Sequence, residues 1–312
     1  MAPMKGLHLA EAYFTSVGLE MIEAQYSEYK FRIAAGLVGM GSECFGYDDD
    51  LSRDHDWGPG FCLWLEENDF RTFGAQLQRS YEALPTIFNG YQRRSSAWGG
   101  GRVGVTEIGT FYSAFIGFPR EPQTLLKWLV IPEENLAACT NGKVFYDPLG
   151  EFSAIRENIR KYYPEDVRLK KIAARCMAAA QSGQYNYARC LKRKDWYSAH
   201  CTLVRFCEAA LSLVFLLNRQ YCPYYKWSRN AAEALPVLGA DAARSVDGLV
   251  RNDDSRNKLA LIEKLCGQLI DVLRQHDLSD SSSDFLLEHG LRVQSRINDQ
   301  ALRQLDVWYA GG

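Results

Sequence analysis

The sequence predicts an α+β protein, in which an N-terminal mixed sheet with flanking helices is followed by an all-helical C-terminal domain. Three observations lead to this fold class. Helix-like and strand-like patterns alternate in the first third of the chain, strand-like runs nearly vanish after about Glu121, and 312 residues exceed what one hydrophobic core usually holds. We therefore predict an α/β domain over 1–120 and a helical domain over 121–312.

The first third begins with a predicted helix over 7–30, where one apolar stripe keeps helical spacing: Ala10, Phe14, Val17, Met21 and Ala24. A second helical pattern covers 68–84. Short apolar runs bordered by glycine predict strands over 31–39, 55–65 and 99–111. Pro59 marks a bulge or an edge position in the strand over 55–65.

The rest of the chain reads as successive helices, over 122–140, 150–163, 164–183, about 185–221 and 257–275. Its most apolar stretch, 201–221, is interrupted by Arg205 and Glu208. We predict a buried helix there and not a membrane span.

Composition narrows the functional classes. The 36 basic and 38 acidic residues give a net charge of −2, which provides no whole-chain reason to expect a nucleic-acid partner. The nine cysteines are odd in number and never spaced as Cys-x-x-Cys, so neither a disulfide framework nor a zinc ribbon is indicated. With no apolar run of signal-peptide length at the N-terminus, we expect a cytoplasmic protein with no membrane partner.

Acidic residues are concentrated in "GSECFGYDDDLSRDHDWG", residues 41–58, which holds five aspartates and one glutamate. On a strand, side chains alternate between faces, so Asp54 and Asp56 are expected on one face and His55 on the other. Two neighbouring carboxylates destabilise each other unless a cation neutralises them. Mg²⁺, which binds through one or two carboxylates plus substrate phosphates, suits this pair.

Gly41 and Ser42 follow the first predicted strand and form a candidate phosphate site. Glycine lets a phosphate approach the backbone, and the serine hydroxyl can donate to its oxygens. The sequence therefore predicts a phosphate-binding turn beside a metal site.

An apolar strand, Gly-Ser, about ten residues and then Asp-x-Asp together resemble the signature of the nucleotidyltransferase superfamily, including its polymerase beta-like and kanamycin nucleotidyltransferase-like members. With "NGKVFYDPLGEF", "YNYARCLKRKDW" and "LLNRQYCPYYKW", residues 35–240 also resemble an uncharacterised bacterial family, a domain of unknown function. The residue between the two aspartates is usually apolar in the superfamily. Here it is His55, for which we favour a structural role.

The resemblance implies transfer of a nucleoside monophosphate from a nucleoside triphosphate, with ATP expected, to an acceptor hydroxyl. Asp54 and Asp56 would be catalytic and would hold Mg²⁺ or Mn²⁺, while Ser42 would hold the β- and γ-phosphates. Glu107, in the third predicted strand, is the candidate for a third catalytic carboxylate. The expected acceptor is a small molecule or a protein rather than RNA.

Basic and aromatic residues of the helical half supply further candidates. Arg189 lies in "QYNYARCLKRKDWYSAH" and Lys226 in "CPYYKWSRN", and either could contact the nucleotide. Both stretches could equally be ordinary solvated or core-closing surface.

Three alternatives stay open. Asp48, Asp49 and Asp50 fit a solvated turn better than a second metal cluster. The whole protein could be a nucleotide-binding regulatory module without catalysis. Less favoured is a HEPN-like ribonuclease using Arg193 and His200, whose spacing of seven would place both on one helical face.

Overall fold

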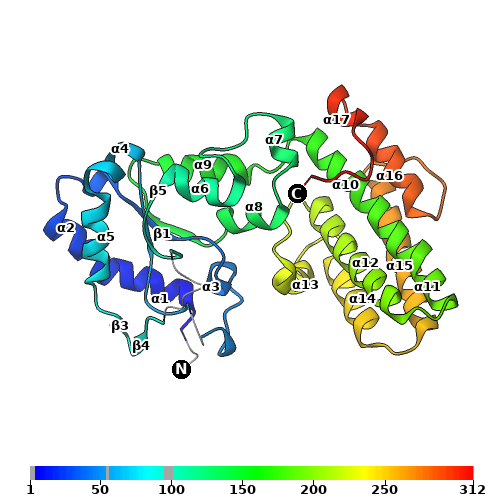
Figure 1. Cartoon of the computed structure of the whole chain (residues 1–312), viewed down its shortest axis with the longest axis horizontal. Helices are drawn as coiled ribbons and strands as arrows, with labels where there is room; N and C mark the ends of the chain where they lie inside the picture. The colour runs from blue at the N-terminus through cyan, green and yellow to red at the C-terminus, as the bar shows by residue number, and fades with distance from the viewer. Residues whose placement is uncertain (1–3, 54–55, 95–100, 312) are drawn as a thin grey trace. The chain divides into compact units, whose positions relative to one another are not determined.

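The computed structural model describes residues 4–53, 56–94 and 101–311. The chain forms two compact units, labelled by element in Figure 1. The first unit holds Met1–Glu121 and Asn135–Lys161, and the second holds Pro122–Glu134 and Tyr162–Gly312. This division differs from the predicted 1–120 and 121–312. Residues 122–134 belong to the second unit, but the chain then returns to the first unit for residues 135–161.

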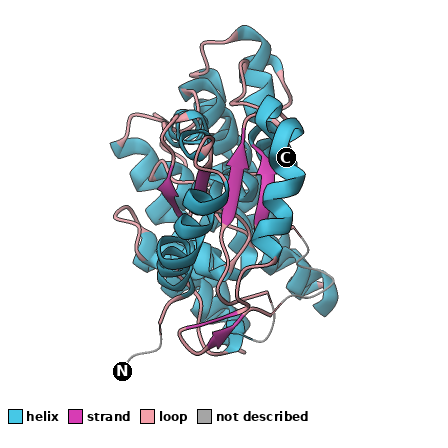
Figure 2. Cartoon of the chain, turned by 90° about the vertical axis from the view of Figure 1, so that its left-hand side faces the viewer, coloured by secondary structure: helices cyan, strands magenta, loops and turns pink. Residues whose placement is uncertain are grey.

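A four-stranded mixed sheet forms the centre of the first unit, in the order β5-β2-β1-β6 (Figure 2). β1 is antiparallel to both neighbours, and β2 is parallel to β5. The strands are β1 Ala34–Leu37, β2 Cys62–Leu65, β5 Gly104–Glu107 and β6 Lys143–Tyr146. The predicted α+β class with a mixed sheet is confirmed, and β6 is a strand that the sequence reading missed.

One face of the sheet packs on helices from the first third of the chain. Leu63 and Leu65 of β2 join a buried cluster with Phe14, Ile22 and Leu77. The helical segments of this region are α1 Gly6–Tyr13, η1 Phe14–Gly18, α2 Leu19–Gln25, α4 Glu67–Asp69, η4 Phe70–Gly74 and α5 Ala75–Glu82. The two helices predicted over 7–30 and 68–84 are thus confirmed in their main extent.

The other face carries Trp64, whose ring stacks on Phe152 with 3.8 Å between centroids. Phe152 lies on α9, Glu151–Arg160, and α6, Ile108–Ile116, adds Phe111 at 5.5 Å from the Trp64 ring. Alternation along β2 therefore places Trp64 and Cys62 on this face and Leu63 and Leu65 on the other.

Short elements complete the first unit. They are η2 Lys30–Arg32, α3 Ser42–Phe45, η3 Leu51–Arg53 and the hairpin of β3 Ile87–Phe88 with β4 Tyr91–Gln92, which lies apart from the main sheet in Figure 2.

The strand predicted over 55–65 is much shorter in the structure, where β2 begins only at Cys62. Asp56 lies in a bend with a left-handed φ of 51°, and Gly58 has a φ of 133°. These dihedrals, together with Pro59, which lacks an N–H group, are incompatible with a regular pleat. The expectation that Asp56 lies on the strand is wrong, and Asp54 and His55 lie outside the described residues.

The second unit is helical, as predicted. α10 packs closely on α12 and α16. The elements of the second unit are α7 Leu125–Leu129, the first two residues of α8 Glu133–Thr140, α10 Glu165–Ala179, η5 Ala180–Tyr187, α11 Ala188–Lys192, α12 Trp196–Leu217, α13 Tyr225–Glu233, α14 Gly239–Arg251, α15 Ser255–Gln275, α16 Leu286–Ser295 and α17 Gln300–Gln304.

Within the described ranges, α12 is long and apolar enough to cross a membrane by length and composition, and 67% of its most apolar window is buried inside the structure. The prediction of a buried helix there is confirmed. The predicted single helix over 185–221 is wrong, however, because the helix is interrupted between α11, which ends at Lys192, and α12, which begins at Trp196. Lys194 has a φ of 58°, and Asp195 caps α12 by accepting a hydrogen bond from Ser198 N at 3.0 Å.

Two fully buried lysines tie the C-terminal segment to the helical unit. Lys170 Nζ donates to the carbonyl of Asp306 at 2.8 Å, and Lys171 Nζ donates to the carbonyl of Ala310 at 3.1 Å. Burial lowers the pKa of Lys171 to about 8, because the ammonium ion is shielded from water.

Candidate functional site

Residues 39–42, here called the glycine turn, leave β1 and lead into α3. Gly39 has a φ of 137°, which favours glycine. The Asn141 side chain holds both backbone groups of Gly39, accepting from Gly39 N at 2.9 Å and donating to Gly39 O at 2.7 Å. Gly142 N also donates to Cys44 O at 2.9 Å. The glycine turn is therefore fixed by a segment 102 residues further along the chain.

Arg102, just before β5, connects Glu43 of α3, directly after the glycine turn, to Asp56. Its Nη2 pairs with Glu43 Oε1 at 2.5 Å, and its Nη1 donates to the carbonyl of Asp56 at 2.8 Å. Glu43, next to Ser42, is only 6% exposed. A Cβ on Gly41 would collide with this ion pair, so glycine is required for the close approach of Arg102.

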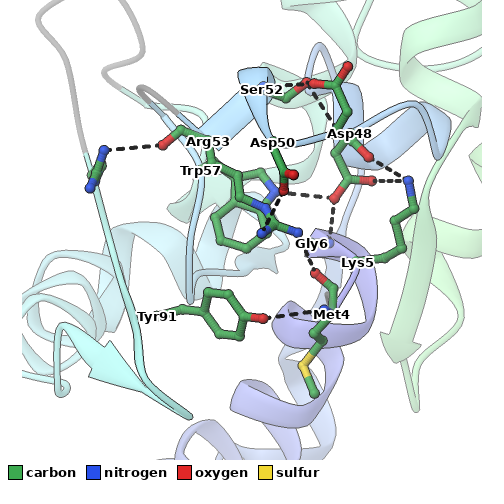
Figure 3. A network of polar contacts seen from close by, with 11 residues as sticks. Met4, Lys5, Gly6, Asp48, Asp50, Ser52, Arg53, Trp57 and Tyr91 are labelled. Atoms are coloured by element: carbon green, nitrogen blue, oxygen red, sulfur yellow. Dashed lines mark hydrogen bonds and ion pairs between the residues drawn. The ribbon is translucent and has the colours of Figure 1, made fainter. Parts of the chain in front are cut away.

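Asp48 is the first residue of the acidic turn, here residues 48–56, and it is buried. Figure 3 shows its polar contacts. Its Oδ2 accepts from Gly6 N at 2.7 Å and from Trp57 Nε1 at 3.3 Å, while Oδ1 lies 3.6 Å from Lys5 Nζ. A carboxylate at the N-terminal end of α1 is favoured by the helix dipole. For Asp48 the predicted solvated turn is therefore wrong.

Asp49 and Asp50 are exposed, as the solvated-turn interpretation predicts. Asp49 Oδ1 accepts from Ser52 Oγ at 2.9 Å and from Ser52 N at 2.9 Å, and these hydrogen bonds, the hydroxyl's more than the backbone's, lower the pKa of Asp49. Asp50 pairs with Arg53 at 3.2 Å, and the Arg53 guanidinium lies over Trp57, 4.8 Å from the ring centroid. These contacts give the turn a structural role, and Figure 3 shows the Asp50–Arg53 pair beside Trp57.

A metal site in this region would depend on Asp54 and Asp56. Among the residues that the structure describes, no group of three or more His, Cys, Asp or Glu side chains could hold a metal ion. The neighbouring Glu43 and Asp48 already have cationic or amide partners. Mg²⁺ often takes only one or two protein carboxylates, so the predicted pair has a suitable chemical type.

Glu107 is the last residue of β5 and also the N-cap of α6. Its carboxylate accepts from Gly109 N at 2.7 Å and from Thr110 Oγ1 at 2.6 Å. In the parallel pairing Glu107 lies beside Leu65, whereas Gly104 lies beside Cys62, at the end of β2 nearer Asp56. The structure therefore does not bring Glu107 to the glycine turn.

The predicted cations of the helical half belong to the second unit. Arg189 is exposed and donates to Tyr185 Oη at 2.8 Å, and Lys226 is exposed with its Nζ 5.2 Å from the Trp227 ring centroid. Their role in nucleotide binding stays a prediction. Arg193 and His200 fall on either side of the break before α12, so the single helical face expected for a HEPN-like pair is absent.

Sequence reasoning missed Arg102, Glu43 and Asn141, which shape the site. The Asn141-Gly142 pair is a turn signal before β6 and could have been noticed. By contrast, nothing local indicates that Arg102 pairs with a glutamate 59 residues away.

Comparison with known proteins gives limited similarity. The family model of a domain of unknown function (DUF4037) matches residues 128–228, a segment that contains neither the glycine turn nor the acidic turn. No curated protein matches the chain. The crystal structure of a nucleotidyltransferase-like protein from Exiguobacterium sibiricum is similar with a TM-score of 0.38 and 10% identity, covering 83% of this chain and 75% of that one. So remote a likeness assigns no activity to this chain.

Proposed function

We propose that this protein is a metal-dependent nucleotidyltransferase, which moves a nucleoside monophosphate from a nucleoside triphosphate, ATP in the first instance, to an acceptor hydroxyl and releases pyrophosphate. The observation that carries the proposal is the double contact of Arg102 with Glu43, next to Ser42, and with the backbone of Asp56. One side chain thus links the segment proposed to bind phosphate with the segment proposed to bind metal. Such proximity is what a phosphoryl-transfer site requires.

The glycine turn would hold the triphosphate. The Arg102 guanidinium, which lies against Gly41, would attract a phosphate oxygen, and the partly buried Ser42 hydroxyl can donate to it. Ser42 Oγ lies 3.4 Å from Glu43 Oε2, a long contact that a phosphate oxygen can replace with little loss. The buried Glu43 and the partly buried Asn141 would keep the turn in place during this exchange.

Asp54 and Asp56 would hold Mg²⁺ or Mn²⁺ through their carboxylates. When bound, the ion would neutralise charge on the triphosphate and orient it for attack by the acceptor hydroxyl. Glu107 has no part in this scheme, because its carboxylate caps α6. The proposed acceptor is a small molecule or a protein.

Pyrophosphate release tests the proposal. The full-length protein is incubated with Mg²⁺, each nucleoside triphosphate and a panel of hydroxyl acceptors, including its own side chains. Asp54→Ala and Asp56→Ala should each lower the rate at least about 100-fold, as loss of electrostatic stabilisation usually does. Asp50→Ala is the matched control, because Asp50 lies in the same turn with an 86% exposed side chain and should leave the rate unchanged.

A second candidate, a nucleotide-binding regulatory module, is favoured by the position of Glu107, since the carboxylate expected to activate the acceptor is committed to a helix cap. Calorimetry with ATP and Mg²⁺ separates the two functions. Tight binding that depends on Asp56, without pyrophosphate release from any acceptor, would favour the module.

A further inference from the structure

A cavity of about 520 Å³ lies in the second unit, whose helices α10 and α12 are labelled in Figure 1. Side chains of α10 and α12 line it, together with residues from the start of α8 and from the C-terminal segment. All of its lining residues belong to the second unit. Its volume falls within the roughly 300 to 1,000 Å³ of pockets that bind small molecules. The helical unit therefore forms a pocket of its own.

A buried ion pair forms part of the cavity wall. Glu133 is 7% exposed, and its Oε1 lies 3.4 Å from Arg175 Nη2 of α10. Ser212 of α12 joins the pair, since its Oγ accepts from Arg175 Nε at 2.8 Å and donates to Glu133 Oε2 at 2.9 Å. Because a buried ion pair is weak evidence for stability, its position at a cavity points to ligand binding.

The Arg175 guanidinium keeps a free donor at this cavity. Its side chain is 24% exposed, and Nη1 forms no hydrogen bond within the described part of the chain, yet it is not a buried atom. The contacts of Nε and Nη2 fix the planar group in one orientation. Arg175 is therefore a preorganised donor for the carboxylate of a ligand.

Charged side chains alternate in sign along the face of α12 that lines the cavity. Arg205, Glu208 and Ser212 are spaced three and four residues apart, so they share one helical face. At a rise of about 1.5 Å per residue, Glu208 lies about 6 Å and Arg205 about 10.5 Å along the axis from Ser212, where Arg175 is bound. Arg205 and Glu208 are exposed, and neither side chain has an ion pair with any residue that the structure describes. Two arginines thus flank an available carboxylate.

Trp308 adds an aromatic surface to the cavity. It is 42% exposed, although the segment that carries it is held in place. The buried Lys170 and Lys171 bind the backbone carbonyls of residues 306 and 310, on either side of Trp308. An indole that is both fixed and partly exposed offers a ring face that an aromatic ligand can cover. The apolar part of the wall also includes Ala178, Ala209 and Leu211.

These features together exclude ligands with a charge of one sign. A simple anion would meet the available carboxylate of Glu208, and a simple cation would meet Arg205 and the free donor of Arg175. A ligand that carries both charges close together satisfies both kinds of group, and the α-carbon of a free amino acid carries a carboxylate and an ammonium group.

We infer that this cavity binds a free aromatic amino acid. Its carboxylate accepts from Arg175 and Arg205, its ammonium group donates to Glu208, and its ring packs on Trp308. The inference goes beyond the proposed function and does not depend on it, because the glycine turn and the acidic turn belong to the first unit.

Isothermal titration of the full-length protein with L-phenylalanine, L-tyrosine and L-tryptophan tests the inference. The amino acid that binds most tightly is then compared with its N-acetyl derivative, which lacks the ammonium group, its amide, which lacks the carboxylate, and glycine, which lacks the ring. Glu208→Gln and Arg205→Gln each remove one charge from an exposed side chain, so both variants should fold. Arg251→Gln and Glu288→Gln are the matched controls, because these exposed residues of the same unit do not line the cavity.

We expect the free amino acid to bind about tenfold more tightly than each of its matched probes, the value of one hydrogen bond to a charged group. Glu208→Gln should weaken binding of the amino acid about tenfold and leave the N-acetyl derivative unchanged. Arg205→Gln should weaken the amino acid to a similar extent and leave the amide unchanged. The controls should alter neither. Failure of all the aromatic amino acids to bind, or equal affinity for the amino acid and either derivative, would overturn the inference and leave the proposed function intact.

Discussion

The ion pair between Arg102 and Glu43 predicts a large loss of stability when only its cation is removed. Arg102→Met keeps the apolar stem but leaves the Glu43 carboxylate without its cation. Removing one partner of a buried pair typically costs about 3 to 5 kcal/mol. Here the Glu43 side chain is 8% exposed and that of Arg102 is 29% exposed, so water reaches the site in part. We therefore expect a loss of about 2 to 4 kcal/mol in the free energy of unfolding.

The double variant Glu43→Gln with Arg102→Met separates pairing from packing. Because no charge then remains buried, most of the loss should be recovered, to within about 1.5 kcal/mol of the wild-type protein. Urea unfolding at pH 7, followed by fluorescence and circular dichroism, measures these differences. Arg71→Met is the control, since its pair with Glu67 is exposed and should contribute less than about 1 kcal/mol. A single variant as stable as this control, or a double variant as unstable as the single one, would refute the reasoning.

Two further stability predictions follow from buried charges. Asp48→Asn should lower the free energy of unfolding by about 1 to 3 kcal/mol in thermal or urea unfolding, because the carboxylate that accepts from Gly6 N loses its charge; an unchanged midpoint would contradict its role at α1. Lys171→Met tests the lowered pKa of Lys171. Between about pH 8 and 10.5 the unfolded chain binds more protons at Lys171 than the folded one, so stability from this group rises with pH. The wild-type protein should gain about 2 kcal/mol relative to the variant between pH 7 and pH 10, and parallel pH profiles would rule this out.

The regular elements of the first unit were predictable because their apolar residues repeat with clear spacing. Phe14 and Met21 follow the helical spacing of the apolar stripe, and the two runs around Ala35 and around Leu63 are apolar enough to indicate buried strands. β6 was missed for the opposite reason. It is four residues long at the edge of the sheet, only partly buried, and lies between two helical patterns.

The candidate site was predictable only in part. The Gly-Ser pair and the aspartates lie close in sequence, so a local pattern was enough to single them out. The backbone conformation of Asp56 could not be predicted in this way. A left-handed residue inside an extended run depends on contacts with distant residues, such as the hydrogen bond from Arg102. Arg102–Glu43 and Asn141–Gly39 join residues that are 59 and 102 positions apart. Contacts over such separations produce no periodic pattern in the sequence.

β6 lies in the sequence well after the other three strands of the sheet, and this position has a consequence for synthesis of the chain. β1 lies between β2 and β6, so a nascent or truncated polypeptide ending at Glu121 would expose one side of β1 as an unpaired edge. Exposed edges of this kind favour aggregation. The sheet can close only after the ribosome has delivered Tyr146, which makes a short N-terminal expression fragment a poor route to the isolated first unit.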